Sequence, residues 1–196
     1  MGADDSFEQR ALRRHRRYQE EIVERYAVCP WAKSARQTGR VRAHVVADVQ
    51  CDATRLKALV DAWADDEACD VAFIILPRFD GGMDAFDQLT AEVGELRPDE
   101  FLSAPFHPGA PEDGGVIRFL RQTPDPTIQL VRRSRLDEVR SQDPAHYQDI
   151  FSLDLDALKP GAPARTVAAS VLAHNTRLVA THREAIAELL RKLKTF

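Results

Sequence analysis

The residues Val-Ala-Phe-Ile-Ile-Leu at positions 71–76 form a continuous apolar run, and Pro77 follows directly. Proline has no backbone N–H to donate to a neighbouring strand, so strand pairing is expected to stop there. A short apolar run without polar alternation is typical of a strand that is buried on both faces. The run therefore predicts the centre of a sheet that helices cover.

Strand-like and helix-like patterns lie on both sides of this run. Strands are predicted at 41–47, 100–106 and 127–132, and helices at 6–29, 53–64, 83–96, 134–141, from Asp143-Pro144 onward, and after residue 165. Because helices separate the first three strands, right-handed crossovers and some parallel pairing are expected. The order predicts an α/β sandwich with a small mixed sheet of three or four strands and long N- and C-terminal helices. A ferredoxin-like arrangement is the nearest known one.

The length and composition are those of one globular domain. The chain has 196 residues, of which 44% are apolar and 30% charged, enough for a single core. One domain over 1–196 is expected, with a flexible N-terminus at 1–5 and a linker at 159–165. No stretch approaches the ~18 apolar residues of a membrane span, and the acidic N-terminus lacks the apolar segment of a secretory signal. A cytoplasmic location is expected.

Charge and cysteine content narrow the classes of partner. The net charge of −4 argues against general binding to nucleic acid or to a membrane surface. The arginines at 10–17 are followed by glutamates at 20, 21 and 24, a spacing that suits ion pairs along a solvated helix face. Three cysteines, an odd number without a CxxC pair, indicate reduced thiols rather than disulfides.

Three segments together resemble a known family. They are Cys29-Pro30-Trp31-Ala32-Lys33, Phe106-His107-Pro108, and Pro124-x-Pro126 before the last strand, with a later element that ends at Asn175. Their order and spacing resemble those of the bacterial proteins catalogued as domain of unknown function 1415, over roughly residues 18–190. That family carries Asn-Arg-Ser-Pro-Tyr-Pro where residues 121–126 read Arg-Gln-Thr-Pro-Asp-Pro. If relatives bind substrate there, this chain binds a different ligand or none. The resemblance implies no known reaction.

Cys29 is the first candidate for chemistry. A thiolate is a strong nucleophile when its pKa is lowered. If Cys29 caps a helix that begins at Pro30, its sulfur faces free N–H groups, and Lys33 adds positive charge. At the end of the first helix, the helix dipole would oppose the thiolate instead. A buried structural cysteine is the third alternative.

His107 and Asn175 are the candidate partners of this thiol. His107 follows the third strand, and α/β folds place sites at the carboxyl ends of strands. An imidazole there could act as a general base, with Asn175 orienting it in a Cys-His-Asn group. The alternatives are a histidine held for turn geometry and an amide satisfied in the core. His15 and His182 are expected to be packing or boundary residues.

The candidate substrate-binding residues are Trp31, Lys33, Arg118 and Arg121. Trp31 and Lys33 belong to the Cys29 motif. Arginines at 118, 121, 132 and 133 suit a carboxylate or phosphate. Acidic neighbours such as Asp125 offer ordinary salt bridges as the alternative.

Three functions follow from these residues. The first is a small enzyme with Cys29 as nucleophile and His107 as base, performing acyl or thiol-group transfer on an anionic small molecule. The second is a non-catalytic domain that binds a small ligand or a protein, and the third is a metal site that uses Cys29 and His107. Neither HExxH nor paired CxxC occurs, and a Cys-Pro dipeptide does not specify haem, so no cofactor is expected. The oligomeric state is left open.

Overall fold

The computed structural model describes residues 6–26, 28–29, 32–110, 119–142 and 167–196. The predicted flexible N-terminus at 1–5, the helix from Asp143-Pro144 and the linker at 159–165 lie outside these residues. So do two predicted site residues, Trp31 and Arg118.

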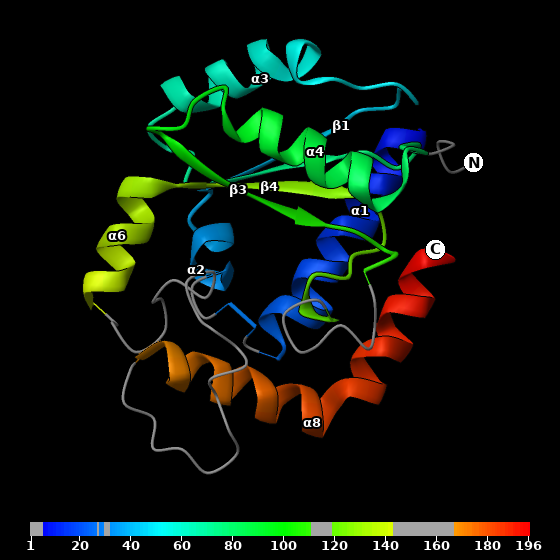
Figure 1. The fold of residues 1–196 in the computed structure, drawn as a ribbon. Helices are drawn as coiled ribbons and strands as arrows, with labels where there is room; N and C mark the ends of the chain where they lie inside the picture. Colours follow the sequence, from blue (N-terminus) through cyan, green and yellow to red (C-terminus); the bar gives the residue numbers. More distant parts are fainter. Residues whose placement is uncertain (1–5, 27, 30–31, 111–118, 143–166) are drawn as a thin grey trace.

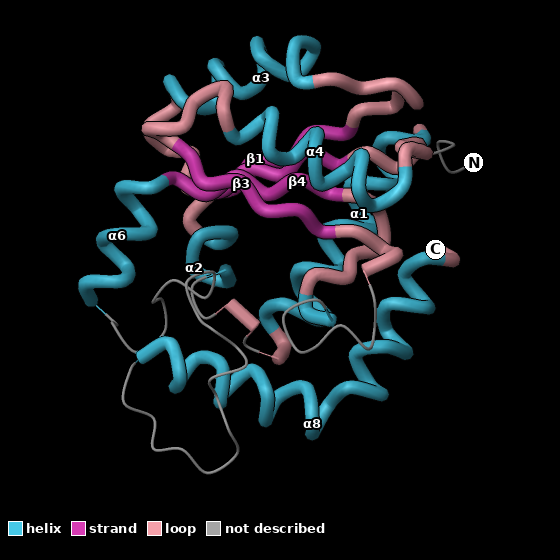
Figure 2. Tube along the Cα trace, in the orientation of Figure 1, coloured by secondary structure: helices cyan, strands magenta, loops and turns pink. Residues whose placement is uncertain are grey.

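The predicted fold class is confirmed: helices pack on a mixed sheet of four strands (Figures 1 and 2). The strands are β1 (Val41–Val45), β2 (Val71–Ile75), β3 (Phe101–Phe106) and β4 (Thr127–Arg132). The helices are α1 (Phe7–Tyr18), η1 (Gln19–Glu24), α2 (Ala32–Gln37), α3 (Ala53–Asp65), α4 (Gly82–Gly94), α6 (Arg133–Gln142) and α8 (Val167–Lys194).

The strand order is β1-β2-β4-β3, with β1 and β2 parallel and β4 antiparallel to both β2 and β3. This arrangement differs from the expected ferredoxin-like one, in which a further strand separates the two strands of each βαβ unit. Here α3 connects β1 to its direct neighbour β2. Helices also cover both faces, with α3 and α4 on one side and α1 and α2 on the other (Figure 1). The physical reason is β2, which is buried along its whole length and needs cover on both faces.

The face under α3 and α4 carries a dense apolar core. Alternate residues of β2 and β4 point toward these helices and meet Leu56, Val60, Phe86 and Val93. Among the strand residues, Ile74, Ile128 and Leu130 are fully buried. This layer is the main packed core of the sheet.

The opposite face carries two smaller clusters. One joins Ala11 of α1 to Val45, Val71, Phe73 and Ile75 of the sheet. The other packs α8 on the end of α1 and on η1, through residues that include Tyr18, Ile22, Leu178, Ile186 and Leu190. The C-terminal helix thus covers the N-terminal helices rather than the sheet itself (Figure 1).

The first helix begins as predicted and ends earlier. Ser6 and Gln9 form a capping box, with hydrogen bonds of 3.0 and 3.2 Å. The α-helix ends at Tyr18, and the six residues of η1 continue it as a π-helix. The wider π-helical turn persists in the hydrogen bond from the Val28 N–H to the Val23 carbonyl. Cys29 therefore lies in the connection to α2, and not at the end of a helix that spans 6–29.

Candidate functional site

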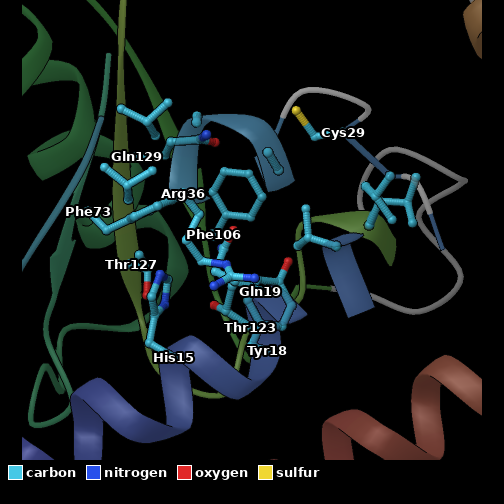
Figure 3. A pocket seen from close by; sticks show the side chains of 17 residues that line it. His15, Tyr18, Gln19, Cys29, Arg36, Phe73, Phe106, Thr123, Thr127 and Gln129 are labelled. Carbon is cyan, nitrogen blue, oxygen red and sulfur yellow. The ribbon is translucent and has the colours of Figure 1, made fainter. Parts of the chain in front are cut away.

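A pocket lies between the sheet and the helices α1, η1 and α2 (Figure 3). Its cavity has a volume of about 100 Å³, within about 700 Å³ of space free of atoms that includes open solvent. Four rings contribute to its wall, those of His15, Tyr18, Phe73 and Phe106, and aliphatic side chains such as Val23 and Val71 add to it. Most of the lining is therefore apolar, as in binding sites for small molecules.

His15 is a buried polar side chain of this wall. Only 5% of the residue is exposed, and its ring centroid lies 4.6 Å from that of Phe73. Burial lowers the pKa of the imidazole from 6.5 to about 4, so the ring is neutral at physiological pH. Its Nε2 atom is buried and has no hydrogen-bond partner within the described part of the chain. Buried polar atoms are nearly always paired, so this one needs an explanation.

Strand β4 supplies polar groups to the same face. Thr127 and Gln129 line the pocket, whereas Ile128 and Leu130 belong to the core on the other face. The Thr127 hydroxyl donates to the Asp125 carbonyl at 2.9 Å, and the Thr123 hydroxyl donates to the same oxygen at 2.7 Å. These two hydroxyls hold the turn before β4.

The segment at 121–126 is tied to α1 by an ion pair. Arg14 donates from Nε to Asp125 Oδ2 at 2.7 Å and from Nη2 to Oδ1 at 2.8 Å, and both side chains are largely buried. Such a two-pronged pair fixes geometry as well as charge. Asp125 thus forms a salt bridge, as its alternative interpretation predicted, although the partner comes from α1 rather than from the nearby arginines.

Arg36 of α2 brings a positive charge to the pocket wall, and acidic neighbours on η1 compensate it. Its Nε and Nη2 donate to the Glu24 carboxylate at 2.6 and 2.9 Å, and Nη1 lies 3.2 Å from Glu20. The hydrogen bond from Arg36 also lowers the pKa of Glu24. The pocket therefore carries little net charge on this side.

Cys29 lines the pocket and is half-buried. Its carbonyl accepts a hydrogen bond from the Ala32 N–H at 3.2 Å, where α2 begins. In Figure 3 its thiol lies at the edge of the group of lining side chains, well apart from His15. Lys33 is exposed on α2. Burial raises the pKa of the other two thiols, Cys51 and Cys69, the latter to about 11.

His107 lies on the other side of the sheet from this pocket. Its ring packs on Phe86 of α4 with centroids 5.4 Å apart, and it is not among the described residues that line the Cys29 pocket. Its ring Nδ1 accepts a hydrogen bond from the Gly109 N–H at 3.0 Å, and the backbone N–H of His107 donates to the Arg121 carbonyl. Burial lowers its pKa. These contacts match the alternative of a histidine held for turn geometry.

The remaining candidates are spread over the molecule. Asn175 is half-buried on α8, and Arg121 is half-buried beside the His107 turn. Arg132 does not join an anion site. Its guanidinium binds carbonyls at the end of α3, with Nη2 2.9 Å from the Trp63 oxygen, and Nε lies 2.8 Å from the Cys69 oxygen. Arg133 similarly binds the Pro98 carbonyl. The expected arginine cluster is therefore divided among backbone contacts.

The residues that make this pocket were not predicted as a site. His15 was expected to be a packing residue, and Phe73, Phe106 and Gln129 had no predicted site role. One signal was available, because Thr127 and Gln129 alternate with Ile128 and Leu130. Alternation of this kind marks a strand with one apolar and one polar face.

Comparisons with family models, with curated proteins and with solved structures gave no match. Within the described ranges, no three His, Cys, Asp or Glu side chains gather closely enough to hold a metal ion. None of the helices in those ranges has the length and apolar character needed to cross a membrane.

Proposed function

We propose that this domain binds a small, uncharged and largely apolar molecule in the pocket between the sheet and α1, η1 and α2. One observation carries the proposal: the same strands pack densely on one face and leave a cavity of about 100 Å³ on the other. Binding sites for small molecules have mostly apolar walls with a few polar groups, and an apolar cavity of about 150 Å³ is enough to bind benzene. The pocket has such a wall, and its volume is of the order that a one-ring molecule needs.

An uncharged molecule fits the electrostatics better than the anion expected from the arginines. Arg36 is compensated by Glu24 and Glu20. His15 is neutral, and burial raises the pKa of the Tyr18 hydroxyl, so that ring stays neutral too. A charge buried there without a partner would lose its hydration and gain little in return.

The π-helix supports a site at this position. Gln19 and Val23 of η1 both line the pocket. Short π-helical segments are less favourable than α-helix and occur frequently at functional sites. Here η1 contributes these two side chains to the pocket wall.

A catalytic use of Cys29 stays a hypothesis, favoured by its place in the pocket wall. It needs a base within hydrogen-bonding reach of the thiol, and His107, expected in that role, contacts Phe86 on the other side of the sheet. The pH dependence of Cys29 alkylation tests it. An apparent pKa well below about 8.5 that rises in His107→Ala would support the pair, and an unchanged value would reject it.

The binding proposal is tested with benzene, an uncharged one-ring molecule, by isothermal titration calorimetry. The wild-type protein is expected to bind benzene, and Val23→Phe, which places a ring in the pocket, should weaken binding by about tenfold or more. Val49→Phe adds the same ring at an exposed position outside the pocket and should leave binding unchanged.

Ala35→Leu is a second blocking variant, from α2, in case Val23→Phe perturbs folding. Thermal melts establish that each variant is folded. Equal benzene binding in the wild type and in both folded blocking variants would contradict the proposal, as would an absence of binding to the wild type.

A further inference from the structure

The unpartnered Nε2 of His15 identifies a polar anchor in the pocket wall. This atom is buried, and no described residue hydrogen-bonds to it. The ring is held on Phe73, with centroids 4.6 Å apart, and near Tyr18 at 6.0 Å. Figure 3 shows the imidazole rising from α1 toward the sheet, beside Thr127. Because α1 and β2 hold the ring, a molecule bound in the pocket can supply the hydrogen-bond partner that no described residue provides.

We infer that the bound molecule carries an aromatic hydroxyl group that hydrogen-bonds to the imidazole of His15. The inference rests on the proposed function and specifies its ligand class. A neutral imidazole has one nitrogen that donates and one that accepts. A hydroxyl can donate or accept, so it pairs with Nε2 whichever nitrogen carries the proton. A carboxylate only accepts and would bring a charge that nothing in this part of the wall balances.

The aromatic part of the inference comes from the rings that surround the anchor. Tyr18, Phe73 and Phe106 line the pocket together with His15. Aromatic side chains pack favourably on other rings in tilted and edge-to-face arrangements, as His15 and Phe73 already do at an interplanar angle of 57°. The cavity of about 100 Å³ is of the order that a single ring needs, since an apolar cavity of about 150 Å³ binds benzene.

Phenol and toluene form a matched pair of probes, because they have nearly the same shape and differ in the hydroxyl. Their affinities are measured by isothermal titration calorimetry and by thermal shift. The wild-type protein is expected to bind phenol at least about tenfold more tightly than toluene. His15→Phe keeps a ring in the wall and removes the nitrogens, so it should bind the two probes with similar affinity.

Nitrogen-15 NMR of the histidine rings supplies a readout that does not depend on the variant. Phenol should shift the ring resonances of His15 in the wild type, and toluene at equal saturation should shift them much less.

Equal affinities for phenol and toluene in the wild type, or a preference for phenol that survives in His15→Phe, would overturn the hydroxyl inference and leave the proposed function standing. Binding of benzene without binding of phenol or toluene would also overturn only the hydroxyl inference. A wild-type protein that binds none of these three molecules would overturn both the inference and the proposed function.

Discussion

The two faces of one strand, β4, differ in a way that separates stability from binding. Ile128 and Leu130 point toward α3 and α4 and are fully buried in the main core. Thr127 and Gln129, their neighbours in sequence, point toward α1 and line the pocket. The same backbone thus supports a filled layer and an unfilled one.

The difference shows how a small domain can keep a pocket at little cost to its fold. Close packing on the α4 face supplies the contacts that hold the sheet together. On the α1 face, aromatic rings, an ion pair and a cluster with α8 hold the helices while leaving space between them.

The largest effect is expected from truncating a ring in the filled layer. Phe86→Ala removes a side chain that is 0% exposed and should lower the free energy of unfolding by about 4 kcal/mol. Phe106→Ala removes the same ring from the half-buried pocket wall and should cost less than about 2 kcal/mol. Chemical denaturation measures both. Equal losses would show that the pocket wall is packed as tightly as the core.

The buried imidazole of His15 should make the pocket face sensitive to acid. Its pKa is lowered from 6.5 to about 4. Between these two pH values, the imidazole is protonated in the unfolded chain and neutral in the folded protein, and this difference favours unfolding. Stability is full above pH 6.5 and falls as the pH approaches 4, by about 3 kcal/mol in total.

His15→Phe should remove this part of the pH dependence. Urea denaturation of both proteins between about pH 7 and pH 4 gives the difference, in which the other titrating groups cancel. Parallel stability curves for the wild type and the variant would mean that His15 titrates normally.

The ion pair between Arg14 and Asp125 is expected to make a smaller contribution to the free energy of unfolding. Arg14→Leu leaves a largely buried carboxylate without its donors and should cost about 2 kcal/mol. Arg16→Leu, on the exposed side of α1, removes a pair with Glu20 and should cost less than about 1 kcal/mol. Thermal unfolding compares the two, and equal small losses would contradict a structural role for Asp125.

The sequence predicted the strands better than the site. The apolar run at 71–76 and the following proline are local signals, and β2 lies at Val71–Ile75. The predicted strand at 127–132 coincides with β4. Local patterns work here because burial on both faces leaves a direct mark in the sequence. The resemblance to domain of unknown function 1415 stays a prediction.

The site depended on contacts between residues far apart in the chain. Nothing local distinguishes a packing histidine from one that faces a pocket, because the surroundings of His15 include Phe73 of β2. The π-helical turn at Gln19–Glu24 also has no simple sequence signature. The position of His107 has a local explanation. Neighbouring residues of a strand point to opposite faces, and Phe106, directly before His107, points into the pocket. His107 is therefore directed to the other side of the sheet.

A methyl-resolved carbon-13 NMR titration with phenol tests most directly the claim that one face binds and the other only packs. The methyl groups of Val23 and Val71, in the pocket wall, should shift and show nuclear Overhauser contacts to the phenol ring. Those of Ile128 and Leu130, in the filled layer, should not. Contacts from phenol to Ile128 and Leu130, or none to Val23 and Val71 at a saturating concentration, would contradict the account.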